Sequence, residues 1–487
     1  MELIKKNIEQ IKTGLIVVLL FITVLLLYFL WGGNIDMKNI FANDSNYIEE
    51  EESNVNIYTF FKPFQGRINF GGDNYTIIYS DMDDLWITFI KSFFPQSSTE
   101  SRSVEEIKKE RWDELLIHKS IEFDLGFDFP FDEIHKLYNT GGTMQFSSIR
   151  KVSKILYTEA APKDFYVFDN ESNKYFRIMT EKEYPEILSE INKVGEKNVD
   201  KYSPIKNYFG GANNTLMPYS LKNNIYAIEC EQEIYYYEEN KIAGLAEKFF
   251  GDSFDFVRKI VETEGTIIYM YGYGTKSLII GNEGHIKYEE AASSSNRKGL
   301  ESVEALDIAV NFIKDHGDWK TLKGKVIYPY LKSIKENDKG YNFVFGYRIN
   351  GYPVYYENND AFEIEIMDGQ VTSYKRYILN QKDTVTVIRN DEETVRNIVT
   401  ANITITNNFE RFKAIYSAKG YDFSKMDYEE TFNQIVNSIQ DVRISYFLRE
   451  NQESLQLEFV PAWAFITEEA RIYFSIDAGE YLGLDTK

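Results

Sequence analysis

The chain has 487 residues, a formal net charge of -22 and a single cysteine, Cys230. The negative charge argues against a nucleic-acid partner, whose phosphates would be repelled over most of the surface, and against a polybasic grip on anionic lipid. One cysteine excludes an intrachain disulfide framework. Aromatic residues make up 16% of the chain. We therefore expect a folded protein with large apolar cores rather than a disordered one.

An apolar segment, Gly14–Trp31, lies near the amino terminus. Its eighteen residues carry no charge and, with their neighbours, predict a transmembrane helix over 13–33. A cleaved signal peptide is the alternative, but the run exceeds the usual apolar region of about 7–15 residues and no A-x-A-like site follows it. Lysines precede the segment and acidic residues follow it, so the positive-inside rule places residues 1–12 in the cytoplasm. We expect a single-pass protein of the cell membrane whose later domains are extracellular.

The part outside the membrane spans about 450 residues, enough for about three domains. Residues 34–54 are polar and acidic and predict a stalk, and 55–200 mixes helix and strand patterns, which predicts an α+β domain. Within it we expect strands at Val55–Phe61 and Tyr75–Tyr79, a helix at Leu85–Phe94, a helix at 104–118 with a capping box from Ser103 and Glu106, a hairpin from Phe165–Phe168 and Tyr175–Ile178, and a helix begun by Pro185.

A polar stretch containing proline and glycine, 195–224, marks a domain boundary, after which 201–300 forms a middle domain. There we expect a strand at Ile225–Tyr237, a helix at Ile242–Phe250 ended by Gly251, and strands at Thr266–Gly272, Ser277–Ile280 and His285–Tyr288.

The last two predicted domains, 301–382 and 383–487, each show a helix followed by an antiparallel meander. In the first, Ser302 caps a helix that ends at Gly317, and strands follow, the last pair joined by a hairpin turn at Asp368–Gly369. In the second, Asp427 and Glu430 form a capping box at the start of a helix that precedes the final strands. The predicted fold class is therefore α+β, with one membrane helix and a structural repeat near the carboxyl end.

No motif for catalysis, a cofactor or a metal stands out. The four histidines show no metal-ligand spacing, and glutamates flank Cys230, which raises the pKa of a thiol rather than activating it. Gly272–Ser277 lacks the Gly-Lys-Ser/Thr order of a phosphate loop, and Asp81–Asp84 lacks the glycine and glutamate of a calcium loop. A general acid–base pair among the many carboxylates has no support, though the pattern does not exclude one.

The segment Gly351–Tyr355 (GYPVY) joins two predicted strands. Glycine and proline fix the geometry of a hairpin connection, which is the simpler interpretation. The functional alternative is an aromatic surface formed by Tyr352 and Tyr355 that binds a partner.

Two carboxy-terminal segments carry a resemblance to a known family. Tyr341–Ile378 has a strand, a G-x-P-V sequence and a strand–Asp-Gly–strand hairpin, and Phe459–Tyr481 has V-P-A-W before a final hairpin with D-A-G-E. With the short basic start and the single apolar helix, the chain resembles the YycH family, and its last domains resemble YycI and, more loosely, PepSY-like domains. Residues 55–300 fit that family only in length and topology.

The resemblance implies a membrane-anchored accessory of the WalK (YycG) sensor histidine kinase in Gram-positive bacteria, with a YycI-like protein as second partner. It implies control of cell-wall metabolism and no catalysis. Thr13, Gly14 and Thr23 are small or polar positions that permit close packing of the anchor against other helices. An anchored extracellular peptidase inhibitor of PepSY-like type is the alternative function, and an unrecognised envelope hydrolase is a third.

Overall fold

The computed structural model describes residues 55–486 except 56, 81, 95–101, 135–145, 223–224, 293–299, 320–326, 357–358, 390–397 and 451–455. Within these residues the chain is mixed α+β, which confirms the expected fold class. No helix in these ranges is long and apolar enough to cross a bilayer. The predicted anchor, 13–33, and stalk, 34–54, lie outside the described residues.

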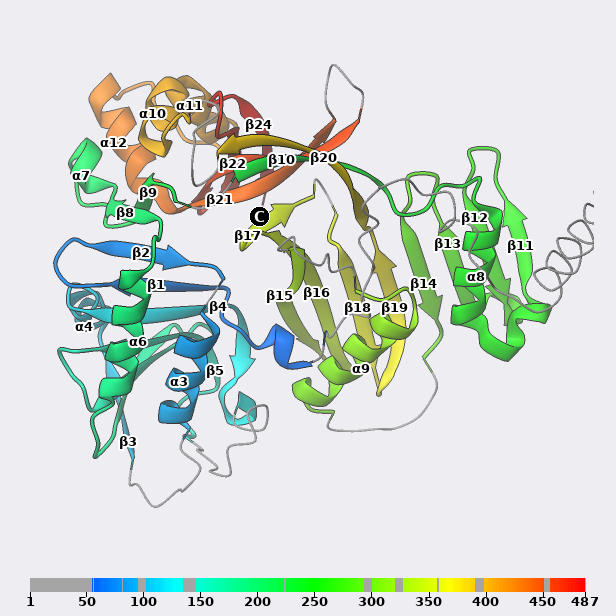
Figure 1. Ribbon diagram of the computed structural model, residues 1–487, viewed down its shortest axis with the longest axis horizontal. Coiled ribbons are helices and arrows are strands. Elements are labelled where there is room, and N and C mark those ends of the chain that lie inside the picture. The colour runs from blue at the N-terminus through cyan, green and yellow to red at the C-terminus, as the bar shows by residue number, and fades with distance from the viewer. Residues whose placement is uncertain are drawn as a thin grey trace, which may run out of the picture. The chain divides into compact units, whose positions relative to one another are not determined.

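The first part of the described chain forms an antiparallel sheet with helices on both faces (Figure 1). In spatial order its strands are β3 (Ser103–Ile107), β7 (Lys174–Met179), β6 (Asp164–Asp169), β5 (Lys151–Thr158), β4 (Ser120–Pro130), β1 (Gln65–Asn69), β2 (Tyr75–Ile78), β8 (Lys201–Pro204) and β9 (Leu216–Ser220). The short helical elements are η1 (Ile57–Phe60), α3 (Asp83–Phe93), α4 (Lys109–Leu115), η2 (Phe131–Glu133), α6 (Pro185–Glu196) and α7 (Lys206–Phe209).

Helix α3 packs on this sheet through a stripe of aromatic side chains. Trp86, Phe89 and Phe93 recur at helical spacing and are buried. Phe89 meets the rings of Phe123 on β4 and Phe165 on β6, at centroid distances of 5.0 and 5.4 Å. Such edge-to-face packing adds about 0.5–1.5 kcal/mol per pair beyond area burial.

The second sheet takes strands from most of the remaining chain. In spatial order these are β11 (Arg258–Val261), β12 (Ile267–Tyr271), β13 (Lys276–Ile280), β14 (Ile286–Glu290), β19 (Gln370–Arg376), β18 (Phe362–Met367), β16 (Gly340–Ile349), β17 (Tyr352–Tyr355), β21 (Ile439–Glu450), β22 (Leu457–Thr467), β10 (Ile225–Gln232) and β20 (Leu379–Arg389). Strand β15 (Ile327–Asn337) pairs with β16, and β23 (Ala470–Ser475) lies between β22 and β24 (Tyr481–Thr486).

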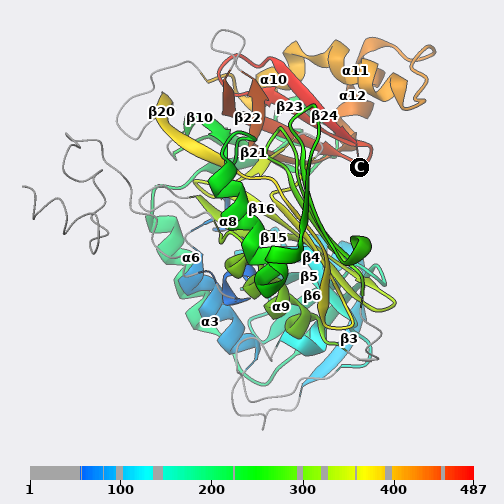
Figure 2. The ribbon, with the colours of Figure 1, turned by 90° about the vertical axis from the view of Figure 1, so that its right-hand side faces the viewer.

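Helices cover this sheet in two places (Figures 1 and 2). Helix α9 (Ser302–Asp315) packs on β16, β18 and β19, and Phe249 of α8 (Glu239–Phe250) contacts Phe312 of α9 and Tyr288 of β14. Near the end of the chain, Phe412 of α11 contacts Phe465 and Phe474. The remaining helical elements are η3 (Gly251–Phe256), η4 (Gly272–Gly274), α10 (Ala401–Asn407), α11 (Phe409–Ala418) and α12 (Tyr428–Ser438).

Strand β17 connects the two meanders of the second sheet. It pairs antiparallel with β16 through Arg348–Pro353 and Ile349–Tyr352, and parallel with β21 through Val354–Tyr446. The GYPVY segment is therefore a short shared strand, and its register fixes how the β15–β19 meander meets the β21–β24 meander.

Several locally encoded elements are confirmed. Asp368 and Gly369 both have positive φ, 51° and 80°, as a two-residue turn between β18 and β19 requires. The Asp427 side chain accepts from the Glu430 amide and the Glu430 side chain accepts from the Asp427 amide, completing the predicted capping box. Pro185 begins α6, and Gly251 follows α8 with a φ of 52°.

Two predicted elements near the start of the described residues are wrong. Ser103 and Glu106 lie in strand β3, which pairs with β7, and the helix begins only at Lys109, because backbone pairing at the sheet edge outweighs a local capping signal. Within the predicted strand Val55–Phe61, Ile57–Phe60 forms a 3₁₀ turn. Phe60 and Phe61 are both buried, and a strand would send them to opposite faces.

Two further predictions need smaller corrections. The strand predicted at Ile225–Tyr237 ends at Gln232, and the tyrosines that follow it lie outside the sheet. Ser302 is the first helical residue of α9 rather than its cap. The cap comes from another part of the chain: a carboxylate oxygen of Glu133 accepts from Ser302 Oγ at 2.6 Å and from the Val303 amide at 3.1 Å.

This long-range cap gives a testable result. Glu133→Ala removes an acceptor from the positive end of α9, so we expect faster hydrogen exchange in the first turn of α9 and a loss of stability of about 1–3 kcal/mol. Glu133→Gln keeps one acceptor oxygen and should lose less. Asp132→Ala changes the exposed neighbouring carboxylate and is the control. Equal exchange of α9 in Glu133→Ala and Asp132→Ala would show that the cap contributes nothing.

Candidate functional site

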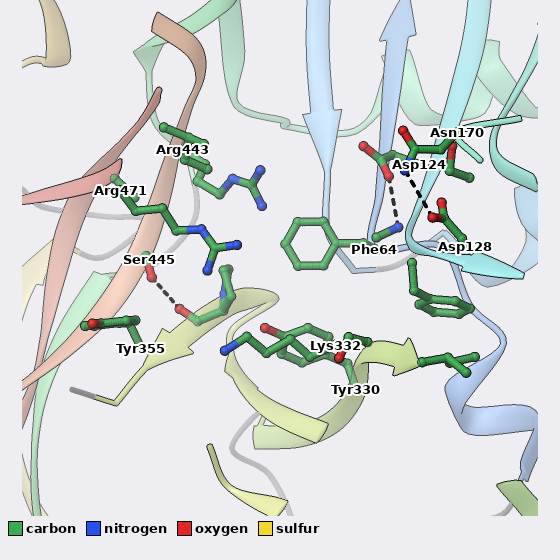
Figure 3. A pocket seen from close by; sticks show the side chains of 18 of the residues that line it. Phe64, Asp124, Asp128, Asn170, Tyr330, Lys332, Tyr355, Arg443, Ser445 and Arg471 are labelled. Atoms are coloured by element: carbon green, nitrogen blue, oxygen red, sulfur yellow. Dashed lines mark hydrogen bonds between the residues drawn. The ribbon is translucent and has the colours of Figure 1, made fainter. Parts of the chain in front are cut away.

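A cavity of about 610 Å³ lies where the first sheet meets strands of the second (Figure 3). Side chains of β4 and β5 line it from the first sheet, side chains of β15 and β17 from one meander, and side chains of β21–β23 from the other. The strand that joins the two meanders, β17, therefore forms part of its wall. Any change in the relative position of these three groups of strands would change the shape of the cavity.

Four cationic side chains line this cavity from the second sheet: Arg443 of β21, Arg471 of β23, and Lys332 and Lys335 of β15. Figure 3 labels Arg443, Arg471 and Lys332. Each of these three also contacts a carboxylate that is not among the lining residues: Asp441 for Arg443, Asp485 at 3.2 Å for Arg471, and Asp360 at 2.5 Å for Lys332. Burial lowers the pKa of the Arg443 guanidinium, but the nearby Asp441, Tyr79 and Asp124 together outweigh burial, so the pKa of Arg443 is raised. The charged lining residues that the second sheet contributes to the cavity are therefore cationic, and their carboxylate partners lie outside the lining.

Carboxylates of β4 line the opposite side (Figure 3). Asp124 lies 3.6 Å from Lys154 Nζ and accepts from the Gly126 amide at 2.9 Å, and Asp128 accepts from Asn170 at 3.0 Å. The carboxylates of Glu122 and Asp124 raise the pKa of Lys154, so this lysine stays charged beside them. This side of the cavity therefore carries two carboxylates and one lysine, and it faces a wall lined by cations.

The ring of Phe64 lies between two arginines. The guanidinium carbon of Arg443 is 4.8 Å from the ring centre, and that of the buried Arg348 is 4.5 Å away. A desolvated cation–π contact contributes about 2 kcal/mol. A Cβ at Gly126, where φ is 80°, would lie 2.8 Å from the Phe64 Cβ, so glycine is needed for this close approach. These contacts hold Phe64 in place as a rigid element of the cavity wall.

The residues predicted from sequence to bind a partner have different positions. Tyr352 is 1% exposed, and its hydroxyl donates to Asp200 at 2.7 Å, so its ring is not at the surface. Tyr355 is half-buried, lines the cavity and stacks on Tyr473 with ring centres 4.6 Å apart. Thr13, Gly14 and Thr23 lie outside the described residues, so their role remains a prediction. A partner-binding role of Tyr355 likewise stays a prediction.

The side chains considered for chemistry have structural surroundings. Burial raises the pKa of the Cys230 thiol to about 12 and lowers the pKa of His316, which lies between aromatic rings. Gly272–Gly274 is a single tight turn followed by strand β13, not by the helix of a phosphate loop. In the described part of the chain, no group of three or more His, Cys, Asp or Glu side chains is placed to hold a metal ion.

Sequence reasoning missed the charged residues of the cavity. Arg443 lies directly between Val442 and Ile444, and Arg471 between Ala470 and Ile472. Asp124 and Asp128 each have apolar residues on both sides in β4. An isolated charge in a strand is a weak signal, because it is equally typical of a solvent-facing position. Only the pairing of distant strands brings these side chains together.

Comparison with known proteins yields one informative likeness. No protein-family profile matches the chain, and no curated protein sequence matches it. Among solved structures, the fold is similar to that of YycH from Bacillus subtilis, with a TM-score of 0.51 and 13% identity over 86% of this chain and 96% of that one. The chain thus has a YycH-like fold.

A second solved structure, an uncharacterized protein from Eubacterium rectale, matches 54% of this chain and 81% of its own, with a TM-score of 0.30 and 14% identity.

Proposed function

We propose that this chain is a membrane-anchored, non-enzymatic regulator of a two-component sensor histidine kinase of the WalK (YycG) type, and that it controls cell-wall metabolism. The observation that carries the proposal is the YycH-like fold over 86% of the chain. The V-P-A-W and G-x-P-V segments and the apolar run near the amino terminus add support from sequence.

The proposed organisation follows the sequence patterns. A cytoplasmic tail, 1–12, precedes a membrane helix, 13–33, and a stalk, 34–54. The extracellular part then comprises 55–200, 201–300 and the two helix-plus-meander units, 301–382 and 383–487. The partners are the kinase, a YycI-like membrane protein and the lipid bilayer, with no role for nucleic acid.

The proposed mechanism uses contacts alone. The anchor packs beside the kinase's membrane helices through Thr13, Gly14 and Thr23, and the exterior contacts the sensor domain. A regulator shifts a kinase between two states only by binding one of them more tightly, and a difference of about 1–3 kcal/mol changes the ratio about 5–150-fold. A rearrangement of the strands around β17 would supply such a difference by changing the exterior contact surface.

Replacing residues 13–33 by an unrelated single-span helix tests the helix part of this mechanism. We expect loss of kinase regulation, measured as phosphorylation of the cognate response regulator in cells, while the amount of protein in the membrane stays the same. The triple replacement of Thr13, Gly14 and Thr23 by leucine should reproduce much of the loss. Full regulation in the helix-swapped protein would show that the anchor only tethers the exterior.

A further inference from the structure

We propose that the cavity bounded by β4, β15, β17, β21 and β23 is a binding site for a short peptide that carries a carboxylate at one end and an ammonium group at the other. This inference concerns binding by the chain itself and does not rest on the proposed kinase partner. It is carried by the carboxylates of one wall, the cations of the other and the aromatic surface between them.

The cationic wall suits a carboxylate. The ends of Arg443, Arg471 and Lys332 converge on the cavity from three different strands (Figure 3). Arg471 and Lys332 are about one-third exposed, so their remaining donors can reach a ligand while Asp485 and Asp360 hold the side chains in position. Guanidinium groups bind carboxylates through paired, charge-assisted hydrogen bonds.

The acidic wall suits an ammonium group. Asp128 accepts from the neutral side chain of Asn170, and no ion pair to it is found in the described residues. The carboxylate of Asp124 lies 3.6 Å from Lys154 Nζ, a distance at which the lysine compensates the charge of Asp124 only in part. An ammonium group placed between these two carboxylates would donate a hydrogen bond to each.

The space between the walls suits a compact apolar body. The rings of Phe64, Tyr330 and Tyr355 line it, and Phe64 is fixed by its contacts with Arg348 and Arg443. A volume of about 610 Å³ falls within the roughly 300–1,000 Å³ of small-molecule sites, so the occupant is a peptide of a few residues rather than a protein loop or domain.

A peptide bound here would touch all three groups of strands at once. Tyr355 lies on β17, whose pairing with β16 and β21 joins the two meanders. Occupancy would therefore stabilise one relative arrangement of the strands. In a regulator of the kind proposed above, this arrangement is what a partner would sense.

The test uses the tripeptide Ala-Phe-Ala with free termini, its N-acetyl form and its C-terminal amide, each titrated by calorimetry into the purified full chain in detergent. We expect the free tripeptide to bind, and either blocked form to bind about tenfold more weakly, as the loss of one charge-assisted hydrogen bond predicts. Because the modification is on the peptide, this comparison does not depend on a variant folding.

Protein variants assign each end of the peptide to a wall. Arg471→Gln should reduce the difference between the free and the amidated peptide, and Asp128→Asn should reduce the difference between the free and the acetylated peptide. Arg449→Gln is the matched control, since Arg449 pairs with Glu458 at 2.8 Å outside the lining residues and should leave all affinities unchanged. Absence of binding, or equal affinity for the free, acetylated and amidated peptides, would overturn the proposal.

Discussion

Replacing Glu233 by glutamine is expected to lower the free energy of unfolding by about 3–5 kcal/mol, because it leaves the charge of Arg376 buried without a counter-ion. The two side chains form a bidentate pair, with Arg376 Nε 2.8 Å and one terminal nitrogen 2.6 Å from the carboxylate oxygens. The Arg376 side chain is 1% exposed, and it also donates to the carbonyls of Gly317 and Asp318 after α9. Urea unfolding followed by tryptophan fluorescence measures the change.

The adjacent residue provides the control for this prediction. Lys375 pairs with Glu363 at 2.7 Å, but its side chain is 52% exposed. Lys375→Gln removes an ion pair of similar length one position away, and solvent screening limits its cost to about 0–1 kcal/mol. A Glu233→Gln variant no less stable than Lys375→Gln would contradict the account of the buried pair. The double change of Glu233 and Arg376 to an apolar pair should recover part of the loss.

Trp463→Ala is the second substitution for which a large effect is expected. It should lower the free energy of unfolding by about 3–5 kcal/mol, because it leaves a cavity in place of one of the largest buried side chains in the described chain. Trp463 belongs to the V-P-A-W segment, lies on β22 between Ile444 and Phe474 of the neighbouring strands, and donates its indole N–H to the Val399 carbonyl at 2.7 Å. We expect both the thermal midpoint and the cooperativity of unfolding to fall.

Two further variants separate packing from hydrogen bonding at this position. Trp463→Phe retains most of the apolar contact and loses the N–H, so it should cost about 1–3 kcal/mol. Phe256→Ala removes an aromatic ring that is 79% exposed and should change stability by less than about 0.5 kcal/mol. If Trp463→Ala unfolded at the same temperature as Phe256→Ala, the V-P-A-W segment would have no structural role in this fold.

The parts of the fold that sequence predicts well are those encoded by a few adjacent residues. Asp368–Gly369 needs no distant partner to form its turn, and the Asp427–Glu430 box satisfies helix amides locally. Where a distant group competes, local signals fail. Ser103 lies in a strand because β7 pairs with that strand. The cap of α9 is the carboxylate of Glu133 in η2 rather than the side chain of Ser302.

The candidate site shows the same difference between residues marked by a local pattern and residues brought together by long-range pairing. Tyr355 was identifiable because glycine and proline mark its segment, but the same pattern wrongly suggested an exposed Tyr352, whose hydroxyl is bonded to Asp200 in the interior. The charged residues of the cavity come from positions near 124, 332, 443 and 471, and no short-range pattern links them. Their juxtaposition depends on long-range strand pairing, which a single sequence does not reveal.

In-membrane crosslinking of the full-length protein in its own host, followed by mass spectrometry of the attached proteins, tests whether this chain acts on a sensor kinase. We expect a sensor histidine kinase and a YycI-like protein to be recovered, and the kinase to be lost when residues 13–33 are exchanged. Recovery of a surface protease or a wall enzyme without any kinase would overturn the proposed function and favour an anchored peptidase inhibitor.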